Sequence, residues 1–446
     1  MTVETGAGFQ SMVDVANGTV ERKIFSDPEI YQLELERIFA RAWNFMCHES
    51  QIPNPGDFFV TYIGEESVIA TRDRTGKLQV FLNSCRHRGN AVCRAESGNT
   101  RSFLCTYHGW TYGLDGKLIG VPGYREFYQE KLDKSQWGLI CAGKVESYKG
   151  FVFATMDPDA PSLEEYLGPT GRFGIDMLAM RGTLKALDGV QKNIISCNWK
   201  LAVDNVFDMY HADISHASAT ITGHRTRPVE LRDKNEQRVQ LGEYGHGMAG
   251  SRMTQRGWDY LEQVRKGEKP PVEMLLQENW RLQPDVAAEL GEMIDQKGNF
   301  NLFPNFWITF NQVCVRMPKG VDKTELWWFT FVPEEFDAEQ RREVIDRANH
   351  FFGPAGMLEQ DDGENWDQST RATRGLIAKR HPLNFQMNVG LGEVKRTNAG
   401  HAYIDTNVNE HAQLWTWVSW AEWMNAESWR TLKKHHAIPP AAGERF

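Results

Sequence analysis

Between residues 51 and 155 the chain consists of short runs of alternating hydrophobic and polar residues, separated by Gly, Asp and Asn. A period of two is typical of β-strands, and the separating residues favour tight turns. The pattern predicts a small antiparallel β domain of roughly 100 residues. The expected strands include 67–71, 78–82 and 150–154, with hairpin turns at Thr75-Gly76 and Asp115-Gly116.

A helical pattern precedes this region. Ser26-Asp-Pro-Glu29 has the form of a capping box, with Pro28 in the first turn. Apolar residues then recur at helical spacing from Tyr31 to Ala42. We expect one amphipathic helix here, within an N-terminal segment, residues 1–45, that packs on the larger of two domains.

The sequence Asp157-Pro-Asp-Ala-Pro161 closes the β-rich domain, which we place at 46–156. From 157 to 446 helical and strand-like segments mix, with no internal repeat. This order predicts an α+β fold with a second domain of roughly 300 residues. The expected helices lie near 197–212, 255–266, 284–296, 337–352 and 416–432, and the expected strands near 305–316 and 325–332.

The composition is that of a globular protein, with 41% hydrophobic and 24% charged residues. The net charge of −9 argues against a nucleic acid or an anionic membrane as partner and suits a basic patch on another protein. Seven Cys, no signal-like N-terminus and no long apolar run predict a cytoplasmic protein with reduced thiols. Most of the 15 Trp and 24 Phe are expected in the core, although such a load also suits an apolar pocket.

Two Cys/His pairs lie in Gly-bearing loops of the predicted β domain. Two thiolates and two imidazoles suit either Zn²⁺ or a Rieske [2Fe–2S] cluster, in which two Cys bind one iron and two His bind the other. Zinc fingers group Cys with Cys and His with His, whereas each half here supplies one of each, which favours the Rieske cluster. The candidate ligands are Cys85, His87, Cys105 and His108, and Cys93 between them is expected to be a buried thiol.

A second candidate metal site lies in the helical pattern that contains Asp208, His211 and His216. On a regular helix His211 and His216 would point roughly 140° apart, so that a shared metal requires a helix break, which we expect near 212–215. Two neutral imidazoles and one carboxylate form the facial triad of non-haem Fe(II) and leave positions open for O₂. The acidic run 353–366 is the richest source of that carboxylate, and residue chemistry alone leaves Glu359, Asp361, Asp362 and Glu364 open.

The run Cys-x-His-Arg-Gly followed by Cys-x-x-His-Gly-Trp is similar to the Rieske signature of aromatic-ring-hydroxylating dioxygenases. From about residue 20 to about residue 430 the chain resembles the large (alpha) subunits of biphenyl, naphthalene and phenylpropionate dioxygenases, including the block Phe-Leu-Asn-x-Cys-Arg-His-Arg-Gly at 81–89. The resemblance implies a small antiparallel β Rieske domain and a larger α+β catalytic domain with an antiparallel sheet of the helix-grip, or START-like, type.

The resemblance also assigns roles to single residues. The family's Glu-x-Asp-Asp block implies that Asp362 is the third ligand of the mononuclear iron. It implies that Asp208 links the two metals, with its carboxylate between His108 of a neighbouring subunit and His211 of its own chain. A carboxylate between two imidazoles would also orient them.

One position departs from the family pattern. Family members commonly carry an amide seven positions before the first iron-binding His, where this chain has Asp204, and the amide of Asn205 is one step closer. We expect Asn205 to act near the iron. The residues expected to line an apolar substrate pocket are Phe207, Met209, Ala212, Phe352 and Leu358.

The resemblance implies a terminal oxygenase that uses O₂, with electrons from NADH arriving through a reductase and a ferredoxin, to cis-dihydroxylate an aromatic ring in the catabolism of aromatic compounds. It implies a homotrimer, with a small beta subunit that gives an α3β3 assembly. A hydrocarbon and an aromatic acid both remain open as substrate. An acid would favour an Arg or Lys that faces the pocket, and the sequence does not show which side chains face it.

Three other functions fit part of the pattern. A Rieske monooxygenase or demethylase would share both metal sites. A non-catalytic Rieske electron-transfer protein would not need the set of His211, His216 and an acidic residue, and a zinc-stabilised binding protein would hold no iron. The run Gly245-His-Gly-Met-Ala-Gly250 matches a dinucleotide-binding motif but lies far from any βαβ pattern, so we expect a flexible loop that does not bind NADH.

Overall fold

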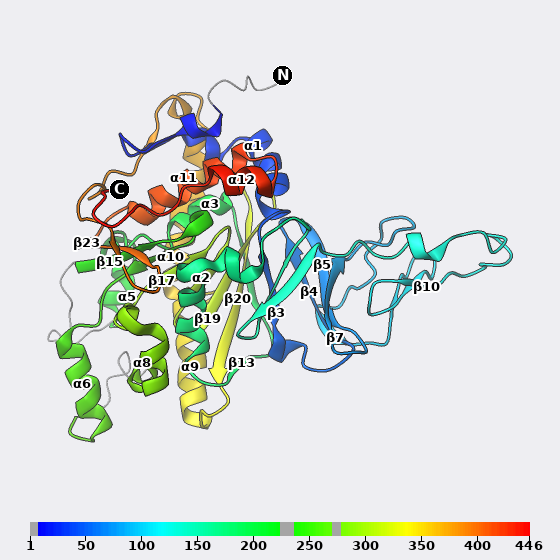
Figure 1. Ribbon diagram of the computed structural model, residues 1–446, viewed down its shortest axis with the longest axis horizontal. Helices are drawn as coiled ribbons and strands as arrows, with labels where there is room; N and C mark the ends of the chain where they lie inside the picture. The colour runs from blue at the N-terminus through cyan, green and yellow to red at the C-terminus, as the bar shows by residue number, and fades with distance from the viewer. Residues whose placement is uncertain (1–7, 224–235, 270–277) are drawn as a thin grey trace. The chain divides into compact units, whose positions relative to one another are not determined.

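The computed structural model describes residues 8–223, 236–269 and 278–446 (Figure 1). The chain divides into two compact units. The small unit comprises Glu34–Leu163, and the large unit comprises Met1–Leu33 and Glu164–Phe446. None of the described helices is long and apolar enough to cross a membrane.

The small unit contains three antiparallel sheets, in the strand orders β6-β5-β4-β7, β10-β9-β8 and β11-β12-β3. Both predicted hairpins are confirmed, since Gly76 and Gly116 adopt left-handed φ angles of 86° and 79° in the turns. The strands are β3 (Asn44–His48), β4 (Asp57–Ile63), β5 (Glu66–Arg72), β6 (Leu78–Leu82), β7 (Ser97–Asn99), β8 (Phe103–Leu104), β9 (Thr111–Tyr112), β10 (Leu118–Gly120), β11 (Lys144–Tyr148) and β12 (Phe151–Thr155).

The large unit is built on an open antiparallel sheet of ten strands, in the order β13-β20-β19-β18-β17-β16-β15-β23-β22, with β14 also paired to β20. A separate small sheet joins β1 (Val13–Asp14), β2 (Thr19–Val20) and β21 (Leu383–Asn384). The strands of the main sheet are β13 (Leu184–Ala186), β14 (Gln191–Ile195), β15 (Glu236–Leu241), β16 (Gly247–Gly250), β17 (Asn299–Leu302), β18 (Phe306–Thr309), β19 (Gln312–Pro318), β20 (Thr324–Pro333), β22 (Lys395–Arg396) and β23 (Ala402–Asn407).

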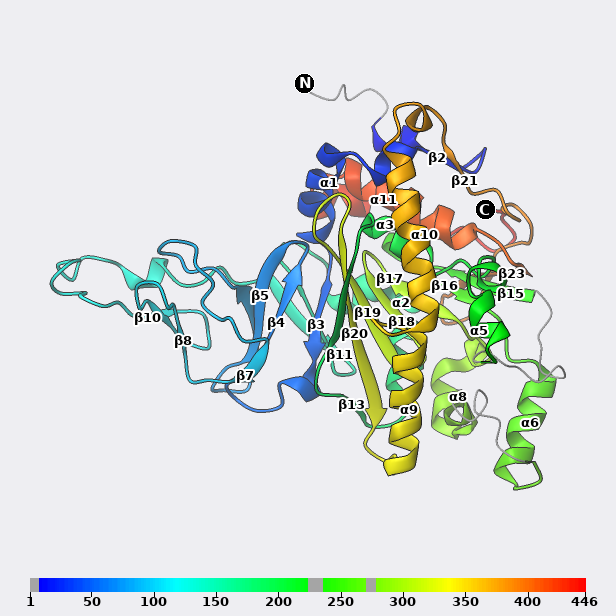
Figure 2. The same cartoon turned by 180° about the vertical axis from the view of Figure 1, so that it is seen from behind.

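Helices cover this sheet. In Figure 2 the long helices α9 and α10 run along the sheet, and contacts join α9 to β20 and α10 to β14 and α3. Helix α11, with five Trp or Met side chains among its buried residues, packs on β15 and β16. The helices are α1 (Pro28–Glu34), α2 (Leu163–Ala179), α3 (Trp199–Asp204), α4 (Ala212–Ser215), α5 (Ala217–Ile221), α6 (Gln255–Arg265), α8 (Pro284–Leu290), α9 (Ala338–Phe351), α10 (Met357–Thr373), α11 (His411–Asn425) and α12 (Trp429–His435). The predicted α+β class is confirmed.

The predicted capping box at Ser26 is wrong. Asp27 caps α1 instead, because its Oδ1 accepts hydrogen bonds from the N–H groups of Glu29 and Ile30. The hydroxyl of Ser26 is turned into the large unit, where it donates to the carbonyl of Thr373. The helix itself is confirmed, and it continues beyond Glu34 as a single π-helical turn.

Several predicted segments have different bounds in the structure. The helix expected at 197–212 ends at Asp204, and the strand expected at 305–316 is the hairpin of β18 and β19, which turns at Phe310, φ 48°. The helix expected at 416–432 is two helices, α11 and α12. The pattern missed α2, which Gly168 and Pro169 interrupt, and it missed α10, whose acidic sequence hides its buried face.

Candidate metal centres and active site

Two loops of the small unit have the same backbone. The Gly89 N–H donates to the Cys85 carbonyl at 2.8 Å, and the Gly109 N–H donates to the Cys105 carbonyl at 2.9 Å. Both glycines have a φ of 75°, in the left-handed region that other residues avoid. The two Cys/His pairs found in the sequence therefore occupy equivalent turns.

Both cysteine sulfurs are buried next to hydrogen-bonding groups. Cys85 Sγ lies 3.2 Å from the Tyr112 hydroxyl, and Asn90 Nδ2 donates to Cys105 Sγ at 3.7 Å. Burial pushes the pKa of Cys105 up, but hydrogen bonds from the Tyr107 N–H, Asn90 and Cys85 outweigh it and lower the pKa. Donors aimed at sulfur are the environment in which thiolates hold an iron–sulfur cluster.

The two histidines of these loops also meet. The rings of His87 and His108 have centroids 4.5 Å apart, and His87 stacks on Trp110 at 5.0 Å. Burial lowers the pKa of His87, and the charge of His108 lowers it further, which favours the neutral ring that binds metal. Cys93 is a buried thiol that donates to the Ala95 carbonyl, as expected. The donor set of two cysteines and two histidines fits a Rieske cluster.

In the large unit three side chains converge. His211 Nε2 and His216 Nε2 lie 3.1 Å apart, and Asp362 Oδ1 lies 3.4 Å from the first and 3.5 Å from the second. Asp362 Oδ1 is buried and has no hydrogen-bond partner among the described residues. Burial raises the pKa of Asp362 to about 7. A buried carboxylate oxygen without a donor, facing two imidazole nitrogens, fits a divalent metal ion.

The helix break lies elsewhere than expected. The predicted break at 212–215 is wrong, because Ala212–Ser215 forms the short helix α4. The chain leaves the helix upstream, after Asp204, and again at His216, whose ψ of 28° separates α4 from α5. His211 and His216 thus cap the two ends of one helical turn, which lets both rings point to the same place.

Asp208 supports the first histidine. Its Oδ1 accepts hydrogen bonds from the N–H groups of Tyr210 and His211, and its Oδ2 lies 3.4 Å from His211 Nδ1. Burial pushes the pKa of Asp208 up, but the hydrogen bond and charge of His211 outweigh it and lower the pKa. For His211 burial lowers the pKa, and Asp208 and Asp362 together raise it above its ordinary value. The pair holds the Nδ1 side of the ring toward Asp208 and the Nε2 side toward Asp362.

The four carboxylates left open by the sequence take different places along α10. Asp362 joins the histidines, and Asp361 Oδ2 lies 3.6 Å from His216 Nδ1 and accepts from the Ser218 hydroxyl. Glu364 is exposed on the outer face. Glu359 is buried, accepts from the Gly353 N–H at 3.3 Å, and has its pKa raised to about 6 by burial.

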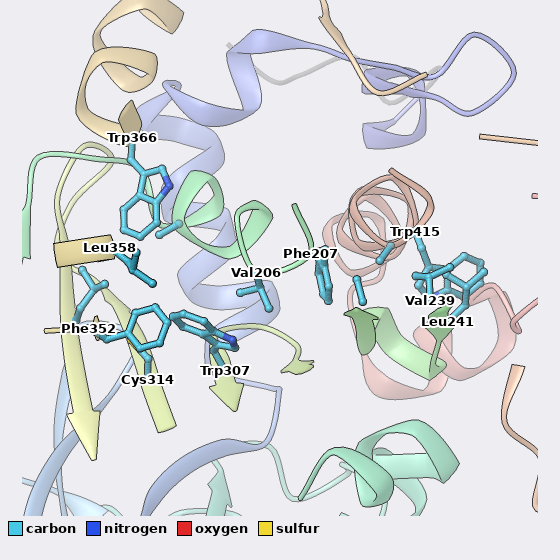
Figure 3. Close-up of a cluster of buried hydrophobic side chains, with 14 of the residues drawn as sticks. Val206, Phe207, Val239, Leu241, Trp307, Cys314, Phe352, Leu358, Trp366 and Trp415 are labelled. Atoms are coloured by element: carbon cyan, nitrogen blue, oxygen red, sulfur yellow. The ribbon is translucent and has the colours of Figure 1, made fainter. Parts of the chain in front are cut away.

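Three of the five expected pocket residues lie in one buried cluster. Phe207, Phe352 and Leu358 are grouped with Val206 and several tryptophans (Figure 3). Met209 and Ala212 are half-buried and lie outside this cluster. Asn205 is the C-cap of α3, and its neighbour Asp204 accepts a hydrogen bond from Trp417 Nε1 at 3.1 Å.

The sequence pattern did not predict the residues that the strands of the main sheet contribute to this cluster. The ring of Phe352 stacks on Trp328 at 4.8 Å and meets Trp307 edge-on at 5.0 Å. Arg316 lies over Trp307, with its guanidinium carbon 4.3 Å from the ring centre. Only the alternation of residues along β19 and β20 signals these side chains, and that alternation is obscured because both faces of β19 are buried.

The Gly-rich run at 245–250 is not the flexible loop we expected. Gly247–Gly250 is the buried strand β16. A Cβ on Gly250 would lie 2.2 Å from the Lys297 carbonyl, and one on Gly247 would lie 3.2 Å from Phe207. His246 is buried between the Tyr166 carbonyl and the Phe303 N–H. The glycines serve close packing inside the sheet.

Two family models match the chain, one over each of the two regions that contain these sites. Residues 42–148 match the family model described as the Rieske [2Fe-2S] domain, and residues 167–399 match that of the ring hydroxylating alpha subunit (catalytic domain). The chain belongs to the ring-hydroxylating alpha-subunit family. It is 36% identical to the biphenyl dioxygenase subunit alpha of Paraburkholderia xenovorans (strain LB400), over 96% of each chain. It is 34% identical to the benzene 1,2-dioxygenase subunit alpha of Pseudomonas putida, over 95% of each chain.

A solved structure shows the same fold. Naphthalene 1,2-dioxygenase from Rhodococcus sp. bound to indole is 33% identical, with a TM-score of 0.79 over 94% of this chain and 98% of that one. The ring-hydroxylating alpha subunit described here is thus the terminal oxygenase of an aromatic-ring-hydroxylating dioxygenase. Its cofactors are a Rieske [2Fe–2S] cluster and a mononuclear iron, and the family works with a ferredoxin and a reductase as an alpha–beta multimer. The predicted family, enzyme class and cofactors are confirmed.

Proposed function

We propose that this subunit cis-dihydroxylates an aromatic ring, with O₂ and electrons that originate from NADH, and that His211, His216 and Asp362 hold the mononuclear iron. The convergence of the two Nε2 atoms and Asp362 Oδ1 carries this proposal. Among the described residues, these three side chains form a group of possible metal ligands whose donor atoms all lie within 4.8 Å of one another. We further propose Cys85, His87, Cys105 and His108 as the cluster ligands, from their equivalent loops.

The bound metals would supply electron storage and O₂ activation. The protein would position the metals and the substrate and would surround them with an apolar environment. Asp208 Oδ2 lies 3.4 Å from His211 Nδ1 and would orient that ring, and Asp361 Oδ2 lies 3.6 Å from His216 Nδ1 and would orient the other. The buried aromatic cluster around Phe207, Phe352 and Leu358 would exclude water and offer apolar area to a ring. Asn205, Met209 and Ala212 remain proposed members of the site.

The assembly belongs to the same proposal. A bridge from Asp208 to His108 of a neighbouring copy requires a ring of subunits, and we propose a homotrimer with a small beta subunit, α3β3, in the cytoplasm. The partition of the chain into a segment 1–45, a Rieske domain 46–156 and a catalytic domain 157–446 is also proposed. Phe9 against Trp420 and Phe25 against Trp417 support packing of the first segment on the catalytic part.

Product analysis with labelled O₂ tests the reaction. Purified subunit, ferredoxin and reductase are supplied with NADH, ¹⁸O₂ and a panel of neutral and acidic arenes. Two labelled oxygens in a cis-diol support dioxygenation, and one labelled oxygen would show a monooxygenase. Iron analysis tests the ligands: about three irons per chain are expected, and about two with no mononuclear signal would contradict the site.

A further inference from the structure

Arg316 is a buried cation without an ion-pair partner in the part of the chain that the structure describes. It lies on β19 and is 1% exposed, and its Nε and Nη1 atoms have no hydrogen-bond acceptor among the described residues. No carboxylate of the described residues approaches within ion-pair distance of it. Arg238, 4% exposed, shows the usual arrangement, because it pairs with Asp295 at 2.7 Å and Asp405 at 2.8 Å. A buried guanidinium with unused donors is costly unless something else binds it.

The strand register places Arg316 on the face of the sheet that carries the aromatic cluster. Cys314 pairs with Trp307 on β18 and with Trp328 on β20, and residues directly opposite one another point to the same side. Arg316, two residues after Cys314, shares that side, and its stacking on Trp307 agrees. Figure 3 shows Trp307 and Cys314 beside Phe352 and below Leu358, in the cluster that also contains Phe207.

The carboxylates with an electrostatic effect on Arg316 come from α10. Burial lowers the pKa of Arg316, and Cys314, Glu359 and Asp362 oppose that shift, but neither carboxylate is within ion-pair distance of the guanidinium. Glu359 Oε2 is bonded to the Gly353 N–H, and Asp362 Oδ1 faces His211 and His216. The guanidinium therefore lies over Trp307 of the aromatic cluster, and its Nε and Nη1 donors are unused among the described residues.

We infer that the Arg316 guanidinium binds a carboxylate of the substrate, so that this oxygenase acts on aromatic acids rather than on neutral arenes. The inference rests on the proposed iron site and pocket. A planar carboxylate would supply the acceptors and the counter-charge that the guanidinium lacks, while the attached ring would pack against the aromatic side chains. Arg316 is thus a specificity-determining residue, positioned by Trp307.

A structural role for Arg316 makes a different prediction. If water molecules bridge Arg316 to Glu359, the cation balances the buried carboxylate and has no effect on substrate choice. Removal of the charge would then weaken acids and neutral arenes equally, or release the iron.

Paired ligands separate these roles. Benzoate and nitrobenzene have the same planar shape and differ in charge, as do 3-phenylpropanoate and its methyl ester. Binding of all four to the iron-loaded, oxygen-free holoenzyme is measured by calorimetry, for wild type, Arg316→Met and Arg316→Lys. Wild type should bind at least one acid about 10- to 100-fold more tightly than its neutral partner. Arg316→Met should lose the preference for the acid over its neutral partner while it keeps its iron, and Arg316→Lys should keep part of the preference.

Two results would overturn the inference: a wild-type enzyme with no preference for either acid, or an Arg316→Met variant that retains it. The first comparison needs no variant, so it stands even if Arg316→Met does not fold. Binding is independent of turnover. If the enzyme forms cis-diols from neutral arenes but does not bind acids, the inference fails and the proposed function stands. If it binds acids but forms no labelled diol, the proposed function fails and the inference about acid binding stands.

Discussion

The two metal-binding regions of this subunit are built in opposite ways. In the small unit each Cys/His pair lies within one tight turn, closed by a hydrogen bond from a left-handed glycine, Gly89 or Gly109. In the large unit the proposed ligands come from two elements far apart in the sequence, since His211 and His216 flank α4 and α10 carries Asp362.

The difference teaches what each region depends on. The loops of the small unit are specified by residues a few positions apart, and their sulfurs are adjusted by nearby donors such as Tyr112. The iron site depends on how α10 packs on the sheet, because a shift of one residue along α10 would replace Asp362 with Asp361. Substitution of an iron ligand in the large unit should therefore abolish function, whereas substitution of a donor beside the sulfurs of the small unit should only adjust it.

The largest effect is expected for Asp362→Ala. Loss of a ligand from a three-residue site should release the mononuclear iron and reduce diol formation to background, because the metal is the reaction centre. The visible spectrum of the cluster should be unchanged. Iron analysis and product yield measure both. Asp361→Ala is the matched control on the same helix and should cost only about 10-fold, through the orientation of His216. An Asp362→Ala variant with full iron content would contradict the site.

Asp208→Ala should have the next largest effect. The carboxylate holds His211 without contacting the other ligands, so both metals should remain bound while turnover falls about 10- to 100-fold. We expect the reduced cluster to be reoxidised slowly by O₂ in the presence of substrate. Stopped-flow absorbance of the cluster follows this step. Normal turnover by this variant would remove the proposed link between the metals.

A pH effect on stability should come from His246, which joins distant segments of the large unit. Its Nδ1 accepts from the Phe303 N–H at 3.1 Å and its Nε2 faces the Tyr166 carbonyl at 2.8 Å, so the neutral ring is required. Burial lowers its pKa from 6.5 to about 3. The folded state then binds fewer protons than the unfolded state, so this contribution is complete above pH 6.5 and is lost as the pH falls toward 3. At pH 5 the loss should be about 2 kcal/mol.

Urea unfolding at pH 7.5 and pH 5.0 measures this loss. His246→Gln, which does not titrate, isolates the contribution from those of other groups. An equal change of unfolding free energy with pH in wild type and variant would show that His246 takes up no proton on unfolding.

The smallest effect is expected in the small unit. Tyr112→Phe removes the hydroxyl that lies 3.2 Å from Cys85 Sγ and accepts from the Arg86 N–H. A hydrogen bond to a charged acceptor is worth about 1.5 kcal/mol, which corresponds to a decrease of ~60 mV in the one-electron potential of the cluster. Redox titration of the purified variant measures it. An unchanged potential would show that the hydroxyl does not bond to the sulfur.

Part of this molecule follows from the sequence. The hairpins at Gly76 and Gly116 and the Cys/His loops depend on local turn chemistry, so pattern and spacing predicted them. The helices α6 and α9 were predicted within two residues because their periodicity is uninterrupted. The prediction at 197–212 was wrong because apolar spacing continues past Asp204, while the hydrogen bonds of Asp208 to Tyr210 and His211 turn the chain out of the helix.

The sequence by itself determined the metals and the ligand types, since the residues that choose between zinc and a Rieske cluster are neighbours along the chain. Residue chemistry left four carboxylates open and only the resemblance pointed to Asp362, whereas the tertiary structure brings Asp362 to the two histidines and turns Arg316 toward the aromatic cluster. The four acidic residues lie on one helix and differ only in whether they are on the side of α10 that packs on the sheet. A strand buried on both faces, such as β19, carries no alternation to show where Arg316 points, so only the register of the folded sheet places that charge.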